Sequence, residues 1–215
     1  MELSQLPIDR FTDALSGKEP TPGGGGACAL VGAVGVSLGH MVGSLTVGKK
    51  KYASVEPDMR RAMEQAARLQ KELLALMDGD AEAFLPLAAA YRLPSDTPEQ
   101  RAEKVAAMEP ALRLAAAAPL SILEKCCEAL DLMERFAAFG SPLAVSDAGV
   151  GAALCWAALT GAAMNVWINT KLMTDQDHAH MLNARTDELL ALYTKKADAI
   201  TASVSEQLKT GGTRK

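Results

Sequence analysis

The chain has 215 residues, enough for one domain with a substantial buried core or for two small domains. Apolar residues make up 49% of it and aromatic residues only 4%, and the abundance of alanine, leucine and methionine favours helices over strands. With a formal net charge of −4, the chain lacks the excess of basic residues that drives binding to nucleic acids.

The four cysteines argue against a zinc site and against a disulfide framework. None belongs to a C-x-x-C pair, and Cys126 and Cys127 are adjacent. Three of the four lie in apolar, helix-like surroundings, as small buried side chains do. The N-terminus, MELSQLPIDRF, lacks the basic start and apolar core of a signal peptide. We therefore expect a protein of the reducing cytoplasm.

The N-terminal part of the chain predicts a short helix, a loop and a long apolar helix. Ile8, Phe11 and Leu15 are spaced as one face of a helix, and residues 17–26 read as a loop. The apolar helix that follows is expected to run to about Val47. Three glycines in it recur at every fourth residue and share one face, where another backbone can approach closely. They are Gly35, Gly39 and Gly43.

A third helix is expected to open at Pro57, with methionine, alanine and leucine at helical spacing. The run Asp78-Gly79-Asp80 is expected to break it. A separate helix over residues 81–91 then follows, which Pro86 bends or ends.

Clear start signals mark the helix that follows. Thr97 can cap it, and Gln100 can return the hydrogen bond in a capping box. The helical pattern continues to Phe139 and is expected to be divided by two prolines, Pro110 and Pro119. Ser146 is expected to cap the second apolar helix and Thr174 the last helix.

No alternating strand pattern or hairpin signal occurs. We therefore expect a single all-α domain over residues 1–215, a multihelical bundle around two central apolar helices.

Two uncharged windows, residues 27–47 and 148–168, are each long enough to cross a bilayer. The first is followed by three lysines, as a cytoplasmic flank can be. Both windows contain more alanine, glycine, serine and threonine than large aliphatic residues, and they include His40 and Asn165. Helices that are apolar all round also occupy the middle of large bundles, and that interpretation, without a membrane, is preferred.

Two motifs resemble ligand sites but fail on inspection. Residues 43–50 nearly match a phosphate loop, but Lys50 replaces the serine or threonine that would hold magnesium, and no strand precedes them. The run from Asp175 to His180 contains possible metal ligands, yet acidic residues are also favoured where a helix begins. We expect neither a nucleotide, nor a metal, nor another cofactor.

Three further features leave two interpretations open. Asn165 and Asn169 share one helical face and either bond neighbouring backbone or line a polar pocket. The basic cluster either complements a helix dipole or receives a carboxylated ligand. The glycine run either makes a tight turn or exposes a helix N-terminus to a small molecule. The cluster comprises Lys49, Lys50 and Lys51, and the run comprises Gly23, Gly24, Gly25 and Gly26.

Four segments, in this order, resemble the family of formimidoyltetrahydrofolate cyclodeaminase and stand-alone methenyltetrahydrofolate cyclohydrolase. They are PTPGGGGACALVGAVGVSLGHMVGSLTVGKKKY, MDGDAEAF, SDAGVGAAL and GAAMNVWINTK. The resemblance spans roughly residues 5 to 205 and is weakest in the last helix. It implies a multihelical fold that forms a homodimer, partly through a helical hairpin. It also implies a tetrahydrofolate substrate that carries a bridging one-carbon unit.

The same resemblance implies the roles of individual residues. The family's catalytic aspartate falls on Asp80, within the D-A-x-A-F motif. Gly26 stands where many relatives have a serine, so no hydroxyl is expected there. Asp147, Asn165 and Asn169 are candidates for the edge of the pterin, and the three lysines are candidates for the anionic glutamate tail.

The function implied first is the reversible hydrolysis of 5,10-methenyltetrahydrofolate to 10-formyltetrahydrofolate, because PTPGGGGA and SDAGV most resemble the stand-alone hydrolases and no formiminotransferase domain is expected. The alternative is formimidoyltetrahydrofolate cyclodeaminase, which releases ammonia and forms 5,10-methenyltetrahydrofolate. A third possibility, of another class, is a non-catalytic folate-binding helical protein.

Overall fold

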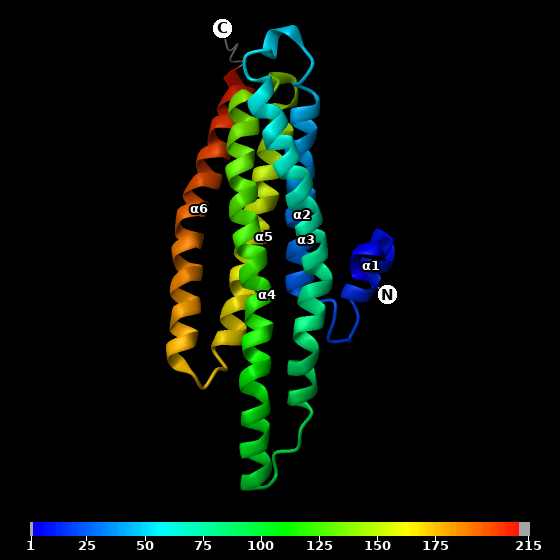
Figure 1. Ribbon diagram of the computed structural model, residues 1–215, viewed down its shortest axis with the longest axis vertical. Helices are drawn as coiled ribbons and strands as arrows, with labels where there is room; N and C mark the ends of the chain where they lie inside the picture. The colour runs from blue at the N-terminus through cyan, green and yellow to red at the C-terminus, as the bar shows by residue number, and fades with distance from the viewer. Residues whose placement is uncertain (1, 211–215) are drawn as a thin grey trace.

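The computed structural model describes residues 2–210 and is helical throughout its regular elements (Figure 1). No strand occurs among the described residues, so the all-α class is confirmed. The helices in chain order are η1 (Leu3–Gln5), α1 (Ile8–Leu15), α2 (Gly24–Ser44), η2 (Lys50–Tyr52), α3 (Glu56–Tyr91), α4 (Pro98–Phe139), η3 (Pro142–Ala144), α5 (Val145–Thr170) and α6 (Gln176–Thr210).

The two apolar helices, α2 and α5, lie side by side and form one layer of the bundle. In Figure 1 the long helices α3 and α4 lie in front of them, and α6 runs along the outer side of α4 and α5. The connected ends of α3 and α4 project beyond the other helices as a helical hairpin. The use of that hairpin in dimerisation stays a prediction.

Glycine allows α2 and α5 to pack closely. A Cβ atom on Gly35 would lie 2.6 Å from the Cys155 Sγ and 2.9 Å from the Gly151 carbonyl oxygen. Any side chain at Gly35 would therefore force the two backbones apart. The glycine face expected from the sequence is thus used for close helix contact.

Two expected helix breaks do not occur. Helix α3 runs through Asp78-Gly79-Asp80 and Pro86, and α4 runs through its two prolines without division. A proline inside a helix removes one hydrogen bond and costs about 3 kcal/mol or more in local terms. Burial of apolar side chains on either side of the expected breaks in α3 offsets the cost of continuing the helix. Leu87 follows Pro86, Met77 precedes Gly79, and both are buried.

The helix ends agree with the sequence in part. The Thr97–Gln100 capping box is present, and Ile8–Leu15 is a helix as expected. Helix α2 begins at Gly24, which was expected to belong to the loop over residues 17–26. It ends at Ser44, three residues before the expected end at Val47. Ser146 lies within α5 and does not cap it.

Thr174 does not cap α6 either, because its hydroxyl donates to Glu109. The cap is supplied by Asp175, whose Oδ1 accepts the His178 backbone N–H at 3.0 Å. Thr174 does not cap because its hydroxyl contacts Glu109 instead and the neighbouring Asp175 takes the cap position.

Three stretches are long and apolar enough to cross a membrane by length and composition alone. They are Gly24–Ser44, Pro142–Thr170 and a window within Pro98–Phe139. Half of the window is buried within the bundle in the first two and 33% in the third. The other helices therefore cover α2 and α5 on one side and leave apolar surface on the other.

Candidate active site

A cavity of about 180 Å³ opens where the N-terminus of α2 meets α3, α4 and α5. Its wall combines main chain from the glycine run with polar side chains from α3 and α5 and apolar side chains from α3, α4 and α5. The lining residues are Pro20, Thr21, Gly23, Gly24, Gly25, Asp80, Phe84, Ala115, Pro119, Asn165, Ile168 and Asn169.

The Asp80 carboxylate lies on the first turn of α2. A Cβ atom on Gly25 would come within 2.2 Å of Asp80 Oδ1, so only glycine permits this approach. The backbone N–H of Gly26 donates a hydrogen bond to the carboxylate. A helix N-terminus presents unpaired N–H groups and partial positive charge, which suits an anion. The glycine run therefore makes room for a carboxylate at the start of α2.

Burial raises the pKa of Asp80 above its ordinary value, and the Gly26 N–H offsets part of this rise. The carboxylate is accordingly a better proton acceptor than one exposed to water. A half-buried carboxylate in a cavity also attracts a cationic centre, because the local dielectric constant is lower than that of water.

Asn165 and Asn169 both bond backbone and line the cavity, so both interpretations left open by the sequence apply. The Asn165 Nδ2 donates to the Gly161 carbonyl at 2.8 Å. The Asn169 Nδ2 donates at 2.8 Å to the carbonyls of Ala115 and Asn165. These bonds hold the amide nitrogens and leave the side-chain oxygens to accept hydrogen bonds from a ligand.

Asn165 also lies against the glycine run, because a Cβ atom on Gly24 would be 3.2 Å from its Nδ2. The cavity therefore joins four helices whose contributing residues are far apart in the sequence: the start of α2, α3 around Asp80, α4 around Pro119 and the last turns of α5.

Sequence reasoning missed several wall residues. Phe84 follows Asp80 by four residues on α3 and so shares its face, a spacing that could have indicated it. Ile168 and Pro119 complete the apolar wall, and no local sequence pattern indicates them.

Cys28 lies one turn inside α2, near Asp80. Burial and the nearby Asp80 raise the pKa of its thiol to about 11, so the thiol is neutral at pH 7.

The structure does not bring Asp147 to this cavity. It lies 18 residues before Asn165 on α5, which corresponds to about 27 Å along the helix axis. Asp147 and the two asparagines therefore lie near opposite ends of one helix and do not face the same pterin within one chain.

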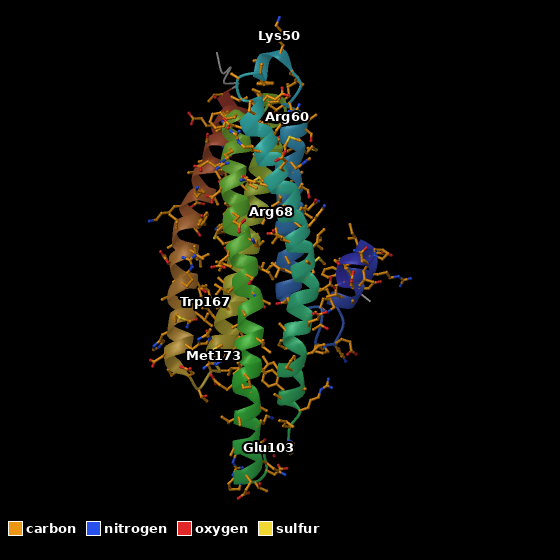
Figure 2. The ribbon with its side chains drawn as sticks, viewed as in Figure 1. Lys50, Arg60, Arg68, Glu103, Trp167 and Met173 are labelled. Atoms are coloured by element: carbon orange, nitrogen blue, oxygen red, sulfur yellow. The ribbon has the colours of Figure 1, made fainter. Side chains whose placement is uncertain are left out.

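The lysine cluster also lies away from the cavity of its own chain. Lys49, Lys50 and Lys51 follow the C-terminus of α2, whereas the cavity lies at its N-terminus, about 30 Å away along the helix. Figure 2 shows Lys50 at one end of the bundle and Met173, which follows α5, toward the other. The Lys49 Nζ donates to the Leu45 carbonyl at the end of α2, as the dipole interpretation requires.

No group of three or more histidine, cysteine, aspartate or glutamate side chains is arranged to hold a metal within residues 2–210. In the run from Asp175 to His180, Asp175 pairs with Arg113 and caps α6. The acidic residue at this helix start therefore has a structural role.

Comparison with known proteins places this arrangement in one family. The family model described as formiminotransferase-cyclodeaminase matches residues 7–188. A methenyltetrahydrofolate cyclohydrolase of Methylorubrum extorquens is 39% identical over 202 residues, covering 94% of this chain and 95% of that protein. The formimidoyltransferase-cyclodeaminase of Gallus gallus is 34% identical over 79% of this chain, which spans 31% of that longer protein.

A solved structure shares the whole architecture. The crystal structure of formiminotetrahydrofolate cyclodeaminase from Thermotoga maritima superposes with a TM-score of 0.80 at 28% identity. The superposition covers 97% of this chain and 98% of that one. The chain belongs to the formiminotransferase-cyclodeaminase family.

Proposed function

We propose that this protein hydrolyses 5,10-methenyltetrahydrofolate reversibly to 10-formyltetrahydrofolate. The observation that carries the proposal is the half-buried Asp80 carboxylate, held over Gly25 in a cavity that Asn165 and Asn169 also line. The 39% identity to a methenyltetrahydrofolate cyclohydrolase, over nearly the full length of both chains, supports the hydrolase over the other family activity.

The chemistry requires a group that stabilises positive charge and accepts a proton. The substrate carries a cationic carbon between N5 and N10. Water adds to this carbon, a C–O bond forms, and Asp80 accepts the proton that the water loses. Transfer of that proton to N5 lets the C–N5 bond break, and loss of the remaining hydroxyl proton to solvent completes the C=O bond of the formyl group on N10. The raised pKa of Asp80 suits both proton transfers.

The remaining wall suits the reduced pterin. The Oδ1 atoms of Asn165 and Asn169 can accept hydrogen bonds from the amide and amino groups of the ring. Phe84 and Ile168 supply apolar contact to its faces. The volume of about 180 Å³ is below the roughly 300–1,000 Å³ of complete ligand pockets. The cavity would therefore hold the reacting end of the folate, with the tail outside.

The second candidate activity is that of a formimidoyltetrahydrofolate cyclodeaminase. The structural relative from Thermotoga maritima and the relative from Gallus gallus favour it, because their names specify cyclodeaminase. In that reaction N10 attacks the formimino carbon on N5, and ammonia leaves. Both reactions pass through a tetrahedral carbon at the same place, so one aspartate serves either.

One preparation, assayed in two ways, separates these candidates. Loss of methenyltetrahydrofolate absorbance reports the hydrolase, and ammonia released from formiminotetrahydrofolate reports the deaminase. We expect the first to be faster. A preparation that binds folate but does neither would instead identify a non-catalytic folate-binding protein.

We further propose that the protein acts in the cytoplasm as a homodimer, without a metal, other cofactor, nucleic acid or membrane. The acidic net charge and the proton chemistry available to Asp80 support this setting. Recovery of the active protein in the soluble fraction without detergent tests it, and recovery only in the membrane fraction contradicts it.

A further inference from the structure

One hydroxyl group in the cavity wall has no role in the packing of the chain. Among the lining residues that the structure describes, only Thr21 carries a hydroxyl. Its Oγ1 makes no hydrogen bond to another residue within 2–210. By contrast, the hydroxyls of Thr46 and Thr186 donate to carbonyls one helical turn earlier, at 2.7 and 2.8 Å. Thr21 is half-buried, so its hydroxyl is left to pair with a molecule inside the cavity.

The local sequence holds Thr21 in one conformation. Pro20 and Pro22 flank it, and Gly23 is the extended N-cap of α2. A proline fixes its own φ near about −65° and restricts the residue before it to extended conformations. Neither proline has an N–H, so neither competes for the Thr21 hydroxyl. The side chain therefore stands on a backbone with little freedom, as a group that positions a reactant must.

The cavity wall at Thr21 is the end of the N-terminal segment, residues 2–23, which we call the strap. The strap contains η1 and α1, and Figure 1 shows α1 to the side of α2 and α3. Asp78 on α3 holds the beginning of the strap. The Ser4 hydroxyl donates to Asp78 Oδ2 at 2.6 Å, and the Leu3 backbone N–H donates to Asp78 Oδ1.

One turn of α3 thus serves both the strap and the reacting carboxylate. Asp78 precedes Asp80 by two residues, so the two side chains leave opposite sides of the helix. Asp78 bonds the beginning of the strap, and Asp80 lies in the cavity that the end of the strap helps to enclose. Between these points Phe11 is buried in the main core. The strap is therefore fixed to the bundle before it reaches Thr21.

The size of the cavity lets one water contact both Thr21 and Asp80. The Asp80 carboxylate lies over Gly25, four residues after Thr21. A compact space of about 180 Å³ is roughly 7 Å across. Two hydrogen bonds of about 2.8 Å each, made through one water, span most of that width.

We propose that the Thr21 hydroxyl orients the water that attacks the bridging carbon, and that Asp78 positions Thr21 by holding the strap. This inference rests on the proposed folate function. The water forms the new C–O bond and gives one proton to Asp80. Its second O–H donates to Thr21 Oγ1 until that proton is lost to solvent as the C=O bond forms. Thr21 keeps its own proton throughout and is neither acid nor base.

This role makes Thr21 a determinant of which reaction the cavity favours. Hydrolysis of the methenyl bridge requires a water held in line with the carbon. Ring closure with loss of ammonia requires none, because N10 is the nucleophile. Removal of the hydroxyl should therefore impair hydrolysis more than deamination.

The role of the hydroxyl is tested with a pair of nearly isosteric variants. We expect T21V to lower kcat for methenyltetrahydrofolate hydrolysis about tenfold, as loss of one hydrogen bond to the attacking water implies. T21S, which keeps the hydroxyl, should stay close to the wild type. T12V is the control, because the Thr12 hydroxyl bonds carbonyls within α1 and lies outside the cavity.

Three results would overturn the role of Thr21 in wild-type protein that hydrolyses the substrate. They are full activity of T21V, an equal loss in T21S, and an equal loss in T12V. Where the wild type also releases ammonia from formiminotetrahydrofolate, T21V should change that rate less than it changes hydrolysis. Equal losses of both activities would refute the specific role in holding water.

The positioning role of Asp78 is tested by a double-mutant cycle. D78A should lower the rate of hydrolysis in the wild type but cause little further loss in T21V, because both changes remove the same placed hydroxyl. S4A removes one bond to Asp78 without a change of charge and should act in the same direction, by less. Additive losses in the D78A/T21V double variant would show that Asp78 does not act through Thr21.

The hold of Asp78 on the strap is tested without any activity measurement. Lys18 is exposed between α1 and α2, so trypsin cleavage after it reports opening of the strap. We expect D78A to speed this cleavage about tenfold. D58A, on the first turn of α3, is the matched control and should not. An unchanged rate in D78A would refute the hold. Wild-type protein inert towards both folates would instead refute the proposed function, and the cleavage rates still decide the hold.

Discussion

The carboxylate of Asp80 on α3 lies so close to Gly25 on α2 that no other residue fits at position 25. A Cβ atom there would be 2.2 Å from Oδ1 and 2.5 Å from Oδ2. Two helix segments more than fifty residues apart are thereby joined at the point where we place the chemistry. This contact explains why glycine, despite its entropic cost, occupies position 25 in the first turn of α2.

Replacing Gly25 by alanine is expected to lower kcat/KM at least about a hundredfold, because the new methyl group displaces the carboxylate from the first turn of α2. Circular dichroism should still show a helical protein. Activity close to that of the wild type would contradict the placement of Asp80.

Gly79 offers a matched control on the neighbouring helix. It lies within α3, directly before Asp80, and a Cβ atom there meets nothing within 4 Å. Gly79→Ala should stabilise the protein by about 0.5–1 kcal/mol through reduced backbone entropy of the unfolded chain, and should retain activity. Urea denaturation measures the gain. A destabilised variant would show that the space around this position is smaller than the structure shows.

Asp80→Asn should nearly abolish turnover, because the amide accepts no proton, while the helical fold is kept. It should also be at least as stable as the wild type at pH 7. Burial raises the pKa of Asp80 in the folded state above its ordinary value of 3.8, so ionisation costs the folded state stability. That cost is absent below 3.8 and fully present above the folded pKa.

The stability advantage of Asp80→Asn should therefore shrink as pH falls through this window. Denaturation curves at pH 7 and at successively lower pH measure it. A variant markedly less stable than the wild type at pH 7 would argue that the ionised carboxylate stabilises the fold.

The pH dependence of kcat/KM should also reflect the raised pKa of Asp80. The acid limb of kcat/KM reports the pKa of the essential base in the free enzyme. Because burial raises the pKa of Asp80, the midpoint of this limb should lie above 3.8. A rate profile measured at fixed ionic strength tests this, with substrate stability checked at each pH. A midpoint at or below 3.8 would exclude Asp80 as that base.

Asn169→Ala should lower the free energy of unfolding by about 1–3 kcal/mol, because the buried carbonyl of Ala115 loses its donor. It should also raise KM if the Asn169 Oδ1 holds the pterin. Asn165→Ala is the control for stability, because the Asn165 side chain bonds the Gly161 carbonyl of its own helix and the destabilisation should be smaller. Equal losses in both variants would contradict the special role of the bond to Ala115.

The local parts of the fold were predictable because neighbouring residues decide them. The capping box needs only Thr97 and Gln100, and helical spacing alone puts Asn165 and Asn169 on one face. The prediction of a break at Asp78-Gly79-Asp80 was wrong, because it rested on local helix propensity and took no account of tertiary burial. Leu73 and Leu87, on either side, are fully buried and hold α3 in one piece.

The sequence by itself determined the helical class, the apolar character of α2 and α5, and the candidates Asp80, Asn165 and Asn169. These follow from composition, spacing and family resemblance. Only the tertiary structure decided that the start of α2, the middle of α3 and the end of α5 converge, with the lysines and Asp147 at the other end. The direction of each helix depends on which distant faces pack together, and no local pattern encodes that choice.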